Sequence, residues 1–127
     1  MPAQKTAADH AADAADAVRQ LNHAGLNAKA ISAPEISLTV QNLITLIDRL
    51  PQALDQLSNH LVLDQRQGQV RMEDGSDPGP RVLEAETHLS DAESDLADIA
   101  GHLRKAGALL FTMGAPWPTD NKETTTE

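Results

Sequence analysis

Residues 36–61, which read ISLTVQNLITLIDRLPQALDQLSNHL, decide the fold because their apolar residues recur at spacings of four and three in strict alternation. The series consists of Ile36, Val40, Leu43, Ile47, Leu50, Leu54, Leu57 and Leu61. With about 3.6 residues per turn, such a series falls along one side of an α-helix. That side must be shielded from water by a neighbouring element.

A second series of the same kind fills residues 82–113, which read VLEAETHLSDAESDLADIAGHLRKAGALLFTM. It consists of Val82, Ala85, Leu89, Ala92, Leu96, Ile99, Leu103, Ala106, Leu110 and Met113. Large and small residues alternate along most of this series, which favours a close approach of two antiparallel helices. We therefore predict that the two series meet in one seam between two long helices.

Start and stop signals place these helices at about residues 33–66 and 80–113, joined by an exposed, glycine-rich loop over residues 68–79. Pro51 lies inside the first of them. Because the apolar spacing continues in phase past this proline, we expect it to kink the helix rather than break it. Two long helices joined by such a loop form an antiparallel hairpin.

A shorter helix is predicted at about residues 7–24, where Thr6 can cap the backbone N–H of Asp9 and Gly25 can end the helix in the left-handed conformation. The fold class is then all-α, a three-helix bundle with coiled-coil-like packing. We expect one domain over residues 1–118 and a disordered polar tail over residues 119–127. The short helix has a side made mostly of alanine, so its burial adds little. We therefore expect a homo-oligomer or a protein partner to complete the core.

Composition limits the classes of partner. The net charge is −9, which disfavours direct binding of nucleic acid and of an anionic membrane surface. The chain has no cysteine, which is typical of a reducing compartment, and no apolar run at its N-terminus marks a signal peptide. We expect a soluble cytoplasmic protein without a membrane-spanning segment.

Apolar residues beside the seam are the candidate interaction residues. The last third of the second long helix is small or apolar on nearly every side, which fits either a closed bundle end or a docking surface. Trp117 stands between two prolines and either covers the bundle end or meets a partner groove. The candidates are Ile44, Leu46, Ala97, Ala100, Leu109, Phe111 and Trp117.

A polar stripe also repeats at spacings of four and three. It consists of Glu84, His88, Asp91, Asp95, Asp98 and His102. Two carboxylate–imidazole pairs within it, Glu84 with His88 and Asp98 with His102, are candidate metal ligands. No second helix supplies matching ligands, so we interpret the stripe as a solvated acidic face in preference to a metal site. We predict no bound metal and no cofactor.

No motif for catalysis is present: the sequence holds no nucleophile elbow, no zinc-protease motif and no phosphate-binding glycine loop. The favoured hypothesis is a non-enzymatic helical interaction or assembly module, an adaptor or oligomeric scaffold subunit, that acts through the apolar seams of its long helices. One alternative is an acidic inhibitor that imitates nucleic acid, through Glu84, Asp91, Asp95 and Asp98, and occupies a DNA-processing protein. The other is a metal-binding helical bundle.

Overall fold

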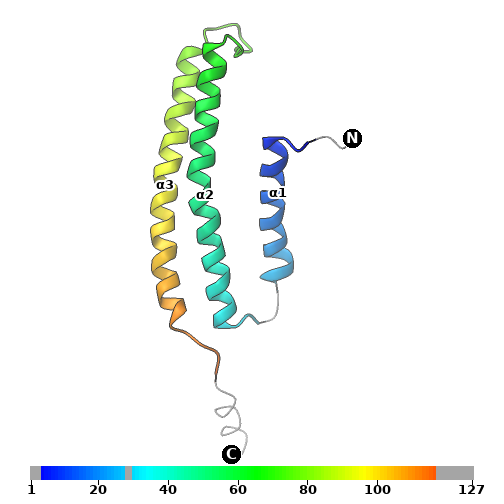
Figure 1. The fold of residues 1–127 in the computed structure, drawn as a ribbon, viewed down its shortest axis with the longest axis vertical. Helices are drawn as coiled ribbons and strands as arrows, with labels where there is room; N and C mark the ends of the chain where they lie inside the picture. Colours follow the sequence, from blue (N-terminus) through cyan, green and yellow to red (C-terminus); the bar gives the residue numbers. More distant parts are fainter. Residues whose placement is uncertain (1–3, 28–29, 117–127) are drawn as a thin grey trace, which may run out of the picture. The chain divides into compact units, whose positions relative to one another are not determined.

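The computed structural model describes residues 4–27 and 30–116 and is helical throughout its regular structure (Figure 1). Its elements are α1 (Ala7–Gln20), a π-helical turn (Leu21–Gly25), α2 (Ala33–Arg66) and α3 (Gly79–Phe111). No strand occurs in this part of the chain. The all-α prediction is therefore confirmed. Contacts divide the chain into two compact units, residues 1–32 and residues 33–127.

The first unit contains α1, which begins at a reciprocal cap. The Asp9 N–H donates to the Thr6 hydroxyl oxygen at 3.1 Å, and the Thr6 N–H donates to the Asp9 carboxylate at 3.0 Å. These bonds satisfy backbone donors that a helix start leaves without partners. The predicted cap is confirmed. None of the α1 residues is buried within this unit.

The end of the first helical segment differs from the prediction. Gly25 does not adopt the left-handed conformation, because the last turn widens instead: the Leu26 N–H donates to the Leu21 carbonyl at 2.8 Å. A bond over five residues closes the turn without a positive φ. The expectation of a left-handed Gly25 is therefore wrong, although the helical segment ends within a residue of the predicted position.

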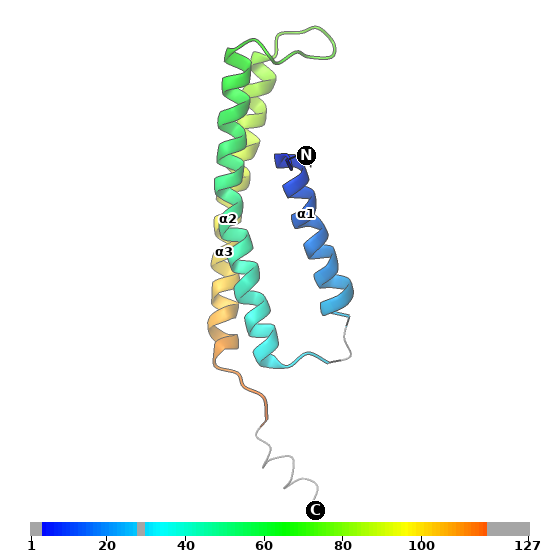
Figure 2. The same ribbon diagram turned by 45° about the vertical axis from the view of Figure 1, so that its right-hand side comes forward.

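The second unit is a hairpin of α2 and α3, which lie side by side and run in opposite directions (Figures 1 and 2). α2 matches its predicted bounds and continues without interruption through Pro51. The break is excluded, and the kink stays a prediction. α3 begins one residue before the predicted start and ends two residues before the predicted end, so Met113 lies past the helix.

The loop between α2 and α3 is mostly exposed, as predicted. Gly68 (φ 73°) and Gly75 (φ 79°) supply the left-handed positions that its turns require. The hydroxyl and the N–H of Ser76 both donate to the Asp74 carboxylate, and these bonds hold the pKa of Asp74 below its ordinary value. The Asp77 carboxylate accepts from the Gly79 N–H at 3.2 Å, which satisfies one backbone donor at the start of α3, while the N-cap residue Pro78 makes no side-chain capping bond.

The seam of the hairpin uses a different line of α2 from the predicted one. Residues of the series through Val40 and Ile47 are half-buried, as expected. The second line of the contact, which we call the inner line of α2, consists of Ser37, Ile44, Pro51 and Ser58. The line predicted for this place, which we call the outer line of α2, consists of Ile36, Leu43, Leu50 and Leu57. Three of its four members are exposed, so this part of the seam prediction is wrong.

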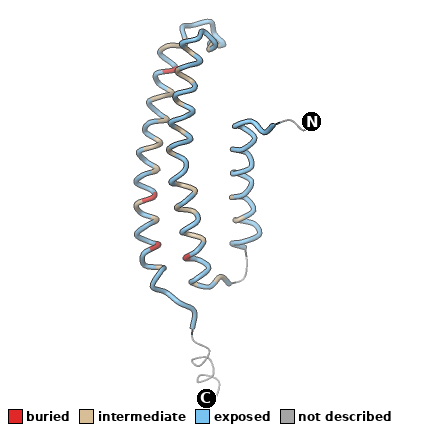
Figure 3. Tube along the Cα trace, in the orientation of Figure 1, coloured by how far each residue is buried: buried red, intermediate tan, exposed pale blue. Residues whose placement is uncertain are grey.

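The same shift occurs on α3. Its inner line consists of Glu86, Glu93, Ala100 and Gly107, all of them buried or half-buried. Its outer line, predicted to lie in the seam, consists of Ala92, Ile99 and Ala106, of which the last two are exposed. The physical reason is side-chain size at Ser37, Ala100 and Gly107, because small residues at these inner-line positions let the two backbones approach closely. Figure 3 shows how few positions of the hairpin are fully buried.

Candidate interaction surface

Gly107 of α3 packs directly against α2. A Cβ atom at this position would lie 3.6 Å from Ile44 Cδ1 and 3.9 Å from Val40 Cγ1, which is ordinary van der Waals contact. Ala100, one heptad earlier on the same inner line, is only 3% exposed. Ser37 on the inner line of α2 is 7% exposed. The seam is therefore built from small residues with larger aliphatic side chains set against them.

The outer lines of both helices form the candidate site. Leu57 on α2 is 50% exposed and Ile99 on α3 is 46% exposed, and Leu50 and Ile36 are also exposed. A soluble helix ordinarily turns such residues inward. We call the surface made by the two outer lines the open edge; its members are Ile36, Leu43, Leu50 and Leu57 of α2 and Ala92, Ile99 and Ala106 of α3.

Helix geometry places both outer lines on the same side of the hairpin. On both helices, each residue of the outer line comes one position before a residue of the inner line. Around each helix axis, the outer line is therefore turned away from the seam in the same direction. In an antiparallel pair, equal rotations bring two lines to the same side of the contact. The contact of Gly107 with Val40 and Ile44 also fixes which residues of α2 and α3 lie at the same height along the hairpin. Leu50 then lies at the height of Ile99, Leu43 at that of Ala106, and Leu57 at that of Ala92.

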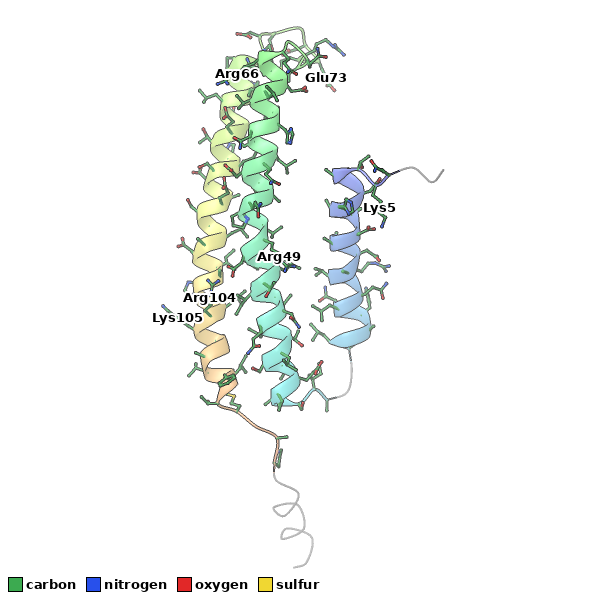
Figure 4. The ribbon with its side chains drawn as sticks, viewed as in Figure 1. Lys5, Arg49, Arg66, Glu73, Arg104 and Lys105 are labelled. Carbon is green, nitrogen blue, oxygen red and sulfur yellow. The ribbon has the colours of Figure 1, made fainter. Side chains whose placement is uncertain are left out.

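The opposite side of the hairpin is polar at its middle, where an ion pair agrees with this geometry. Asp48 and Arg104 each follow a seam residue by one position, so the same rule places both on the other side. Their side chains form an ion pair there, and both are about half exposed. We call this side the closed edge. Arg104 is labelled on α3 in Figure 4, and Arg49 projects from α2 on the side away from α3.

The predicted polar stripe of α3 divides into two lines. Glu84, Asp91 and Asp98 each follow a seam residue by two positions, so they lie on the outermost face of α3. His88, Asp95 and His102 each precede a seam residue by one position and form the rim of the open edge on α3; all six residues are exposed. Glu84 binds Arg81, with 2.9 Å between Oε2 and Nη1. The corresponding rim on α2 holds Thr39, Leu46, Ala53 and His60, none of which carries a carboxylate. The open edge is therefore apolar in its centre, and its rim on α3 carries one carboxylate, that of Asp95.

The metal candidates stay separate from one another. Among residues 4–27 and 30–116, no group of three or more His, Asp or Glu side chains is placed to hold a metal ion. The pairs Glu84 with His88 and Asp98 with His102 follow one another along an exposed helix face, and the arginine at position 81 already engages the first carboxylate.

The predicted interaction residues fall into three places. Ile44 and Ala100 lie in the seam, where Ala100 is buried, so they hold the hairpin together rather than form a free surface. Leu46 is half-buried on the rim of the open edge, and Ala97 is exposed on the side of the closed edge. Exposed apolar side chains mark the end of α3 at Leu109 and Phe111. Trp117 lies outside the described residues.

Sequence reasoning missed the outer lines as a surface, because it placed Leu50, Leu57 and Ile99 in the seam. A signal was present. α2 has apolar residues on two adjacent lines, and α3 has Ala100 and Gly107 directly after Ile99 and Ala106. Two antiparallel helices can bury only one choice of lines fully, and the small residues indicate which choice gives the closer contact.

No protein-family model, curated protein or solved structure matches the chain. In the described part of the chain, no helix combines the length and the apolarity that crossing a bilayer demands.

Proposed function

We propose that this chain is a non-enzymatic helical interaction and assembly module of the cytoplasm, and that it acts through the open edge. The single observation that carries the proposal is the row of exposed Leu and Ile side chains on one side of the hairpin. A contiguous apolar surface of this kind marks a protein interaction site, because leaving it in water forfeits the free energy of its burial.

The asymmetry between the two edges supports this function. The middle of the closed edge holds the Asp48–Arg104 ion pair, and the exposed large apolar residues of this edge on α3, Leu83 and Phe111, lie at the two ends of the helix. On the open edge, Leu50, Leu57 and Ile99 are each at least a third exposed. Completing the burial of such a side chain contributes about 1 kcal/mol, roughly half of the value for a whole Leu or Ile. Several of them in a row provide enough free energy to hold a partner.

Two leucines of α2 provide a matched test. Leu57 is 50% exposed on the open edge, and Leu63 is 51% exposed on the outermost face of the same helix. We expect the full chain to enter a larger complex, alone or in an extract of its natural host, when followed by sedimentation. Leu57→Asp should abolish this complex, whereas Leu63→Asp should preserve it. A wild-type chain that stays monomeric in both settings, with both variants behaving alike, would overturn the proposal.

A further inference from the structure

We infer that the partner of the open edge is a second copy of this chain, and that two α2–α3 hairpins pack face to face as a symmetric four-helix bundle. This inference rests on the proposed function and names its partner. Each α2 would lie on the α3 of the other copy, with the two-fold axis parallel to the helices. All neighbouring helices are then antiparallel, as in up-and-down bundles.

The size of the open edge suits such a dimer. From Ile36 to Leu57 it extends about 32 Å, at about 1.5 Å per residue. Two helices with axes about 8–10 Å apart present a face roughly 20 Å wide. The face therefore has an area of roughly 600 Å² per copy, or about 1,200 Å² for both copies, which reaches the lower end of stable interfaces. A single docked helix would cover only the groove between α2 and α3.

The shapes along the open edge are self-complementary in this arrangement. At two of its levels a leucine of α2 lies at the height of an alanine of α3, Leu43 with Ala106 and Leu57 with Ala92. An axis parallel to the helices keeps these levels, so each leucine meets the partner's alanine. An axis across the helices would instead place α2 on α2 and α3 on α3, which removes this pairing of large with small residues.

The charges are compatible with the same arrangement. The rim of α3 carries a single carboxylate, that of Asp95, which would lie at the height of Ala53 on the rim of the partner's α2. The rim of α2 has no carboxylate at Thr39, Leu46, Ala53 or His60, so no two like charges are brought together across the contact. The pairing of leucine with alanine therefore selects the orientation of the second copy.

Light scattering on the purified full chain tests the dimer. We expect twice the chain mass for the wild type and for Leu63→Asp, and the mass of one chain for Leu57→Asp. Circular dichroism should show equal helix content in all three proteins, since Leu57 is half exposed within the hairpin. A purified wild type that is monomeric throughout the micromolar range overturns the second copy. If a Leu57-dependent complex still forms in extract, the proposed function survives with a different partner.

Cysteine pairing tests the orientation without relying on a disruptive variant, because the chain has no cysteine of its own. Ala53 and Asp95 are exposed, and they lie at equal heights on opposite rims of the open edge. A mixture of Ala53→Cys and Asp95→Cys chains should oxidise to a mixed disulfide dimer, whereas each variant alone should remain unlinked. Efficient linking of one variant to itself would overturn this arrangement. A mixture without any linked product, from a monomeric protein, would indicate that the edge is covered within its own chain.

Discussion

The two edges of the α2–α3 hairpin are built from the same two helices and have opposite chemistry. The closed edge has Asp48 and Arg104 joined across it, and the inner lines beside them carry small residues at Ala100 and Gly107 together with Ile44 and Pro51. The open edge carries leucine, isoleucine and alanine, with large side chains half in water. Over the middle of the hairpin, the exposed leucine and isoleucine side chains therefore lie on the open edge, whereas Leu83 and Phe111, on the closed edge, lie at the two ends of α3.

A hairpin of two helices explains why so few residues of the described chain are fully buried. The buried hydrophobic residues of the described chain are Val82 and Ala100. Two helices can shield only the strip between them, so any third apolar line remains at the surface. A second pair of helices on the open edge would turn the outer lines into a core like the one that the inner lines already form.

The largest difference in stability is expected between substitutions at Ile44, on the inner line of α2, and at Leu57, on its outer line. Ile44→Asp places a carboxylate against Gly107 in the seam and should lower the free energy of unfolding by about 3 kcal/mol or more. Leu57→Asp, measured at a concentration low enough to exclude association, should cost about 1 kcal/mol or less. Urea unfolding followed by circular dichroism measures both. Equal losses would mean that the two lines are buried alike, which contradicts the distinction between the edges.

Two glycines in the C-terminal half of α3, Gly107 and Gly101, test how closely the helices pack at the seam. Gly107→Leu should lower stability by about 1–3 kcal/mol, because the added atoms collide with Ile44 and Val40. Gly101→Leu is the control, since no side-chain atom lies within 4 Å of its added Cβ. It should raise stability by about 0.8 kcal/mol through helix propensity. If Gly107→Leu also stabilised the protein, the helices would not approach closely at this point.

The helices themselves were predictable from sequence, and the choice of seam was not. The alternating spacing defines one side of a helix to within one line, because adjacent lines lie only about 50° apart at heptad spacing. α2 was therefore placed within its correct bounds, from Ala33 to Arg66. Whether Leu50 or Pro51 faces the neighbour depends on how closely the backbones can approach, which is a property of both helices together.

The candidate site follows the same logic. The acidic residues 84, 91, 95 and 98 were predicted as one exposed stripe, and their exposure is confirmed. The interaction residues were harder to predict because exposure reverses between adjacent positions, as from Ile99 to Ala100. A rotation of one residue in the seam exchanges a buried position for a half-exposed one. Only the partner helix fixes that rotation, through contacts such as that of Gly107 with Ile44.

The smallest effect concerns the ion pair of the closed edge. In a double-mutant cycle with Asp48→Asn and Arg104→Gln, the coupling free energy should be about 0.2–1 kcal/mol, since both side chains are about half exposed. High salt should reduce it, because mobile ions screen charges that water can reach. Chemical unfolding at two ionic strengths measures both quantities. A coupling well above about 2 kcal/mol that resists salt is the behaviour of a desolvated pair. It would mean that a partner covers this edge, and the roles of the two edges would be reversed.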